Sequence, residues 1–228
     1  MEKVVAIITG IGIKQPDIMA DVRLVADRFE RLNGIPVKLI TDEDVKDLPL
    51  VAPHFACYYA WQMVDNDVDR LICMDCDIIP FHALPKRLPD ADFAAVSENS
   101  RWGDSAKSTI PLIKRAGTYF NSGLFIAKRS ARPVFERMTA RQTALRNGVW
   151  ILDQTLLNVE VQTAVALEEI TFEKLSKNWC MPFWDLRPGL EPSMVHYLSL
   201  TNLIKMRLVG RLIRTLNALE TEATGAER

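Results

Sequence analysis

Two carboxylates, Asp75 and Asp77, stand two residues apart directly after an apolar run over residues 71–74. The run predicts a buried β-strand that ends at the pair. Bare carboxylates are costly to bury without partners, whereas oxygen ligands at this spacing suit a hard divalent cation, Mn²⁺ or Mg²⁺. We therefore expect a metal site at the carboxyl end of a central strand, where open α/β sheets bind their ligands.

The elements that must position this pair alternate along the chain between strands and helices. Short apolar runs predict strands over residues 4–8, 36–40, 70–74, 93–96 and 123–127. Helical spacing and helix-starting residues predict helices over residues 22–33 and 55–64, after Pro133 and from Asp153. The strand–helix–strand start implies parallel strands with right-handed crossovers. Residues 99–118 are polar and contain Gly103, Pro111 and Gly117, which predicts a loop or lid.

Composition excludes several classes of protein. Of the 228 residues 48% are hydrophobic, so the chain is globular. The 28 basic and 29 acidic side chains nearly balance, which excludes a nucleic-acid binder that works by bulk charge. Four cysteines with a single C-x-x-C form neither a disulfide framework nor a zinc site. No apolar run is long enough for a spanning helix or a signal peptide, and we expect a reduced, cytoplasmic setting.

Four segments in chain order resemble glycosyltransferase family 8. These segments are Leu71–Asp77 with its D-x-D, Tyr119–Leu124 with Asn-Ser-Gly, Leu152–Gln154 followed by Asn158, and Val195–Tyr197. The resemblance spans residues 4 to about 198. It implies a GT-A-like nucleotide-diphospho-sugar transferase fold, which is an α/β fold with a mostly parallel central sheet flanked by helices.

The resemblance also implies roles for individual residues. His196 would be a third metal ligand beside Asp75 and Asp77, and Thr9 would touch the uridine. Asp153 would bind sugar hydroxyls, and Gln154 would lie beneath the anomeric carbon. The catalytic set implied is Asn121, Asp153 and Gln154, and the substrate-binding set is Thr9, Asp75, Cys76, Asp77, Asn121, Ser122, Gly123, Asp153, Gln154 and Lys205. Glu98 or Asn99 is a further candidate for the donor sugar.

The chain departs from the family pattern at two places. The family usually has an Asp and a Tyr soon after the residue equivalent to Thr9, where this sequence has Gly10-Ile11-Gly12-Ile13. After the histidine the family usually has a Gly and then a lysine that contacts the diphosphate, but the next lysine here is Lys205. These departures affect the expected contacts with the base and with the diphosphate.

The C-terminal residues 199–228 predict a basic amphipathic helix with a frayed tail over residues 220–228, attached to a glycosyltransferase domain over residues 1–198. On a helical wheel Arg207, Arg211 and Arg214 share one face. The opposite face holds Leu208, Val209, Leu212, Ile213 and Leu216. Two interpretations are open: the helix packs on the domain, or it docks on an anionic membrane at the inner face.

The sequence thus predicts a metal-dependent, retaining transferase. It would move a hexose from a UDP-sugar, UDP-glucose or UDP-galactose, to a saccharide acceptor that is lipid-linked or belongs to a surface polysaccharide. One alternative is a haloacid-dehalogenase-like phosphatase with Asp75 as the nucleophile. The other is a non-catalytic module that binds a nucleotide sugar or a glycan.

Overall fold

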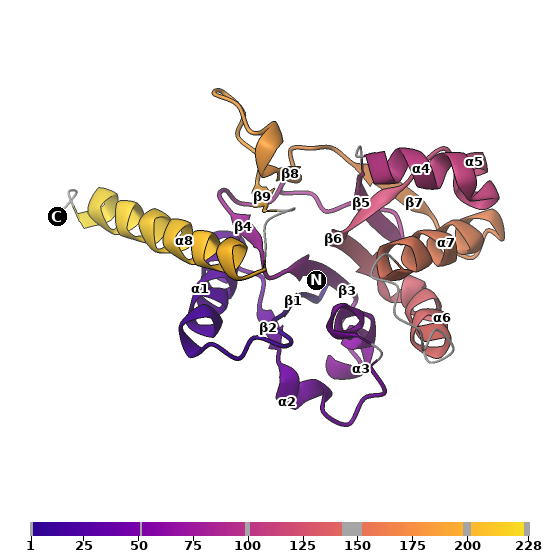
Figure 1. The fold of residues 1–228 in the computed structure, drawn as a ribbon, viewed down its shortest axis with the longest axis horizontal. Coiled ribbons are helices and arrows are strands. Elements are labelled where there is room, and N and C mark those ends of the chain that lie inside the picture. The colour runs from indigo at the N-terminus through magenta and orange to yellow at the C-terminus, as the bar shows by residue number, and fades with distance from the viewer. Residues whose placement is uncertain (1, 51, 99–100, 143–151, 198–201, 226–228) are drawn as a thin grey trace.

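The computed structural model describes residues 2–50, 52–98, 101–142, 152–197 and 202–225. Within these ranges six strands form a central sheet in the order β2-β1-β3-β6-β5-β7 (Figure 1). Their bounds are β1 Val4–Thr9, β2 Val37–Ile40, β3 Arg70–Asp75, β5 Phe93–Ser97, β6 Phe120–Lys128 and β7 Phe172–Leu175. Strand β6 runs antiparallel to both neighbours and the other pairs are parallel, which confirms the mostly parallel sheet.

Helices cover both faces of this sheet, and the side chains of each strand alternate between the two faces. Ile72 and Met74 of β3 join a core with α1 (Pro16–Asn33) and α8 (Asn202–Gly225). Leu71 and Cys73 join a second core on the opposite face. The elements packed there are α6 (Arg132–Gln142), α7 (Leu152–Ala166), the 3₁₀-helix η1 (Pro53–Tyr59) and α3 (Ala60–Met63). This burial on both faces explains the wholly apolar strand sequences.

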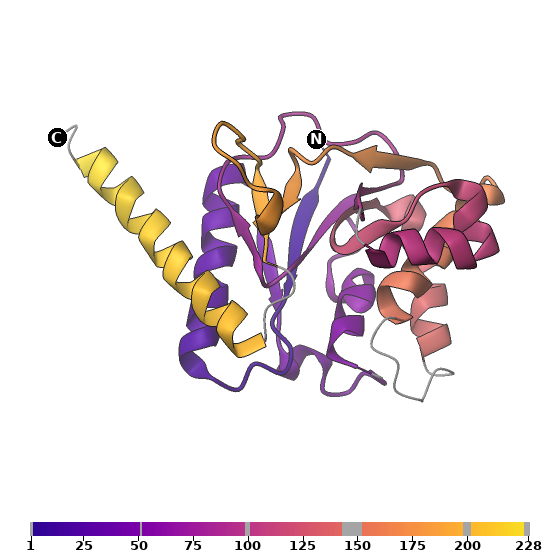
Figure 2. The ribbon, with the colours of Figure 1, turned by 45° about the horizontal axis from the view of Figure 1, so that its top comes forward.

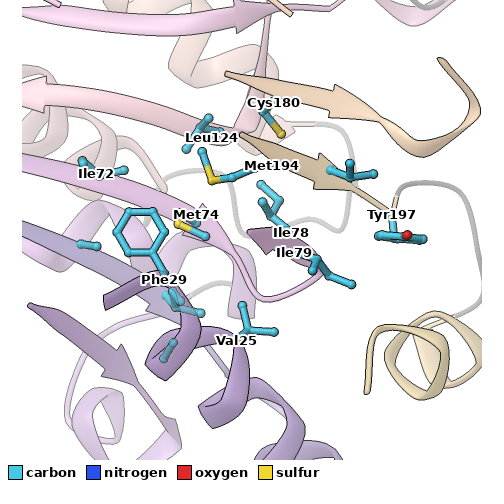
Figure 3. Packing of buried hydrophobic residues seen from close by; sticks show 14 of the residues in the cluster. Val25, Phe29, Ile72, Met74, Ile78, Ile79, Leu124, Cys180, Met194 and Tyr197 are labelled. Atoms are coloured by element: carbon cyan, nitrogen blue, oxygen red, sulfur yellow. The ribbon is translucent and has the colours of Figure 1, made fainter. Parts of the chain in front are cut away.

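A small second sheet lies beside the carboxyl ends of the main strands. Its described strands pair in the order β4-β9-β8, with β4 Ile78–Pro80, β8 Cys180–Pro182 and β9 Met194–His196. Figure 3 shows how Met194 packs among Met74 of β3 and Phe29 of α1. The small sheet is therefore fixed to the main one by a shared apolar core.

Residues 101–116 form two helices, so the prediction of a loop over 99–118 is wrong; residues 99 and 100 lie outside the described part. Helix α4 spans Arg101–Thr109 and α5 spans Pro111–Ala116. Pro111 is the first residue of α5, and Gly117 ends it in the left-handed region with φ of 66°. Pro111 and Gly117 are therefore helix boundaries, since proline suits the first turn and glycine the residue after the last, whereas Gly103 lies within α4.

Other predicted elements differ in detail. The helix expected over 55–64 is the 3₁₀-helix η1 continued by the short α3, and the strand expected over 123–127 begins earlier, at Phe120. The helices expected after Pro133 and from Asp153 are α6 and α7. Three further short elements are α2 Asp42–Val45, η2 Arg129–Ala131 and η3 Phe183–Asp185.

The C-terminal helix α8 lies along α1, and its far end projects from the body of the molecule (Figures 1 and 2). Val209 and Ile213 are fully buried against the domain, whereas Leu208 is 40% exposed. Arg214 forms an ion pair with Asp21 of α1. The apolar face of α8 is thus used for packing, and contact of its arginine face with a membrane stays a prediction. Among the described residues, no helix combines the length and apolar character needed to cross a bilayer.

Candidate active site

Asp75, Asp77 and His196 converge at the carboxyl end of β3. The Nε2 atom of His196 lies 3.2 Å from Oδ1 of Asp77 and 3.7 Å from Oδ2 of Asp75. The pairing of β4 with β9 produces this proximity, because it sets Ile78, the residue after Asp77, opposite His196. His196 and Asp77 are buried, and the Asp75 side chain is 50% exposed. Of the three side chains, Asp75 is therefore the one whose carboxylate is open to solvent.

The three side chains fit a divalent cation. Each offers one ligand atom, and these atoms all lie within 4.8 Å of one another. Two carboxylate oxygens and one imidazole nitrogen form a donor set that suits Mn²⁺ and accepts Mg²⁺. The predicted ligand set is thus brought together by the fold.

Gly123 of β6 makes room for the imidazole. A Cβ atom at this position would lie 2.3 Å from Cε1 of His196 and 2.8 Å from Oδ1 of Asn121. Glycine is therefore required by close approach of side chains. Asn121 and Gly123 both lie within strand β6.

A hydrogen-bond network joins β6 to α7 next to the metal ligands. The Oε1 atom of Gln154 accepts from the backbone N–H of Ser122 at 3.0 Å, from Nδ2 of Asn121 at 3.2 Å and from the Ser122 hydroxyl at 3.3 Å. Asn121 also donates to Glu98 at 2.8 Å and accepts from Gly123 N–H through Oδ1. Because a backbone N–H can only donate, the amide orientation of Gln154 is fixed.

Asn158 fixes α7 against the strand that carries Asn121. Its Oδ1 accepts from Phe120 N–H at 2.8 Å, and its Nδ2 donates to the Phe120 carbonyl at 2.9 Å. Asn158 is fully buried. It therefore holds the register between helix and strand, one turn after Gln154.

Asp153 lies in the first turn of α7, where the Tyr58 hydroxyl donates to its Oδ2 at 3.4 Å. Burial raises the pKa of Asp153 above its ordinary value, and the nearby His54 acts in the opposite direction. The predicted sugar-binding carboxylate is thus half-buried and held by a tyrosine from η1. His54 and Tyr58 were not predicted as site residues, because nothing in the spacing of η1 links them to α7.

A pocket of about 170 Å³ opens beside the cluster, between β6 and the small sheet. Its lining includes Glu98, Asn121, Lys177, Trp184, Asp185 and His196. Lys177 and Asp185 form an ion pair of 2.6 Å, and Trp184 is 48% exposed. Sequence alone does not identify Lys177, Trp184 and Asp185 as pocket residues, since a Trp-rich segment far along the chain carries no spacing that assigns it to the site.

Thr9, Cys76 and Lys205 complete the set of predicted site residues. Thr9 pairs in register with Asp75, so both lie at the same edge of the sheet. Cys76 stands between the two aspartates and packs against the core below them. Lys205 belongs to α8, but its side chain lies outside the described part.

No family model and no curated protein matches this sequence. Among solved structures, a glycosyltransferase involved in glycosylation of the major capsid of PBCV-1 has a TM-score of 0.65 at 9% identity, over 90% of this chain and 98% of that one. The galactosyltransferase LgtC, in complex with donor and acceptor sugar analogs, has a TM-score of 0.56 at 12% identity, over 92% of this chain and 95% of that one.

The glycosyltransferase GlyE of Streptococcus pneumoniae TIGR4 has a TM-score of 0.55 at 14% identity, over 97% of this chain and 65% of that one. At such identities the likeness concerns the fold. The chain has the GT-A-like α/β fold, which it shares with these glycosyltransferases.

Proposed function

We propose that the protein is a metal-dependent, retaining glycosyltransferase that moves a hexose from UDP-glucose or UDP-galactose to a saccharide acceptor. The observation that carries this proposal is the cluster of Asp75, Asp77 and His196 beside a pocket, in a fold shared with glycosyltransferases. The cluster suits Mn²⁺ or Mg²⁺, and the pocket provides hydroxyl-binding groups.

The donor would lie across the carboxyl edge of the sheet. Asp75 and Asp77, with His196, would hold the cation that offsets the charge developing on the departing diphosphate. Thr9, adjacent to Asp75 at the same edge, is on the side expected for the uridine. Asn121 lies on the opposite side, where its amide is held by Glu98 and Gln154. The donor sugar would therefore rest on β6 and α7.

In the transfer, the bond between the anomeric carbon and the leaving phosphate oxygen breaks, and a bond to the acceptor oxygen forms. The acceptor proton passes to the departing phosphate. Gln154 is unsuited to be a covalent nucleophile, because its carbonyl oxygen already accepts three hydrogen bonds. Retention of configuration would then follow from departure and attack on one face of the sugar. Asp153 would orient a sugar hydroxyl, with Tyr58 holding the carboxylate.

The experiment is release of UDP from UDP-glucose and UDP-galactose with Mn²⁺, with an acceptor panel and analysis of the anomeric product. We expect Asp77→Asn to lower kcat/KM by roughly 100-fold or more, because it removes a buried ligand charge. The control is Asp90→Asn, an exposed aspartate paired with Arg87 away from the cluster. Equal rates in the parent and in Asp77→Asn would contradict the proposal.

The two alternatives give different results in the same assays. A phosphatase that used Asp75 as nucleophile would be trapped by beryllium fluoride, and we expect no such trapping. A non-catalytic module would bind a UDP-sugar without UDP release. Slow release that depends on Asp77 would exclude the module.

A further inference from the structure

A second pocket lies on the other side of the small sheet from the metal ligands. Its volume is about 400 Å³, which is within the range of small-molecule sites. The segment between β8 and β9 forms much of its wall and projects from the body of the molecule (Figure 1). Its lining includes Phe81, His82, Leu186, Arg187, Leu190 and Val195.

The pocket of about 170 Å³ beside the metal ligands is called the first pocket here. At two places in the chain, one residue lines the first pocket and its immediate neighbour lines the second. In β9, His196 lines the first pocket and Val195 lines the second, as expected for neighbours on a strand whose side chains alternate. At the end of η3, Asp185 lines the first pocket and the next residue, Leu186, lines the second. The two pockets are thus separated by a single layer of backbone and share an edge at residues 184–187.

Large apolar side chains are exposed at this edge and just beyond it. Trp184, Leu186 and Leu190 have 48%, 41% and 43% of their surface exposed. They are three of the six large hydrophobic side chains found exposed in the described part of the chain. Such a concentration marks a binding surface, whereas single exposed leucines are ordinary. His82 and Arg187 supply polar groups at the same pocket.

We propose that the second pocket binds the apolar aglycone of the acceptor, so that the acceptor is an amphiphilic glycoside. This inference rests on the proposed glycosyltransferase function. The acceptor sugar would enter the first pocket over Trp184, next to His196. Its alkyl portion would cross the edge at residues 184–187 and bury apolar surface against Leu186, Leu190 and Phe81.

The test compares methyl and octyl β-glycosides of glucose, galactose and lactose as acceptors, below the micelle concentration. In the parent we expect the KM for the octyl glycoside to be about tenfold lower than for its methyl counterpart, because several methylene groups are buried. In the double variant Leu186→Ser/Leu190→Ser that ratio should fall to near one. The control is Leu167→Ser, a leucine that is 63% exposed after α7, which should keep the tenfold ratio.

Failure of this inference is distinguishable from failure of the proposed function. If the parent transfers sugar with equal KM for octyl and methyl acceptors, the aglycone site is wrong and the glycosyltransferase stands. If no UDP is released with any acceptor, the glycosyltransferase is wrong, and the acceptor proposal falls with it. A loss of the octyl preference in Leu167→Ser would also overturn the inference.

Calorimetry of octyl glucoside without donor gives a readout that does not depend on activity. Binding by the parent that the double variant loses supports the pocket, and absence of binding by the parent overturns it. Sedimentation tests a second copy of this chain as the occupant. A parent that dimerises through these leucines, with a monomeric double variant, would overturn the proposal.

Discussion

A histidine can serve as a metal ligand here only because the facing residue has no side chain. The imidazole of His196 lies over Gly123, and the two residues before Gly123, Asn121 and Ser122, hold Gln154. One strand therefore controls the position of the proposed metal ligand His196 and of the proposed sugar-binding groups. This arrangement explains why amide, hydroxyl and glycine residues follow one another at positions 121–123.

We expect Gly123→Ala to weaken Mn²⁺ binding by about tenfold or more, because the new methyl group would overlap His196 and displace its ring. Titration of Mn²⁺ by calorimetry measures the change. Gly210→Ala is a matched control, since a Cβ atom at Gly210 of α8 would also overlap a side chain, that of Asp21 in α1. That variant should lose stability and keep its affinity for Mn²⁺. Unchanged affinity in Gly123→Ala would show that His196 is not a ligand.

Helix α7 is held in register by one amide, and this determines the position of Gln154 relative to β6. We expect Asn158→Ala to lower the free energy of unfolding by about 2–3 kcal/mol, because it leaves the buried N–H and carbonyl of Phe120 without partners. The change should also lower kcat. Thr163→Val on the same helix loses only a bond to the Val159 carbonyl and should stay within about 0.5 kcal/mol. Urea unfolding and steady-state rates check both, and equal losses in the two variants would contradict this role.

Helices α1 and α8 are joined to the small sheet through Arg28. Its side chain is 2% exposed, donates to the carbonyls of Pro80 at 2.6 Å and Phe81 at 3.2 Å, and pairs with Glu220 at 2.6 Å. We expect Arg28→Met to cost about 2–4 kcal/mol of unfolding free energy, because the buried Pro80 carbonyl loses its donor and the partly buried Phe81 carbonyl and Glu220 carboxylate each lose a partner. Arg31→Met is the control, since Arg31 pairs with the same Glu220 but is 51% exposed, and should cost less than about 1 kcal/mol. Equal costs in urea unfolding would refute this account.

The elements that sequence predicts best are those with long or regular patterns. The apolar runs identify the main strands, and the run before Asp75 locates the metal ligands, because a strand buried on both faces has few alternatives. The strands of the small sheet have three residues each, too few to show a period, so nothing local predicts that β4 and β9 pair. The place of His196 came from family resemblance, and Trp184 and Lys177 depend on long-range packing that spacing does not encode.

At the scale of the whole molecule, the candidate site is built from residues of both sheets. The main sheet supplies Asp75 and Asn121, and the small sheet supplies His196 and part of the wall of each pocket. The site therefore needs the two sheets to keep their relative position, which the shared core and the α1–α8 pair ensure. Near the β5–β7 end of the main sheet, one carboxylate connects the segment before β5 with the segments that contain Ser130 and Thr171.

That carboxylate is Asp92, which accepts from the backbone N–H of Thr171 at 2.8 Å, from its hydroxyl at 2.7 Å and from Ser130. Burial alone would raise the pKa of Asp92, but these hydrogen bonds outweigh it, and the pKa lies below its ordinary value. A lowered pKa in the folded state contributes stability above about pH 4, the unfolded value, and this is lost as the pH falls through the folded value.

We therefore expect Asp92→Asn to lower the free energy of unfolding by about 1–2 kcal/mol at pH 7, and by progressively less as the pH falls toward 2 and the parent carboxyl becomes protonated as well. Urea unfolding across this pH range measures the difference. Asp90→Asn, two residues away at an exposed ion pair with Arg87, should change stability by less than about 1 kcal/mol at either pH. A loss in Asp92→Asn that stays constant from pH 7 to pH 2 would mean that packing at this edge, and not the charge of the carboxylate, joins β5 to β7.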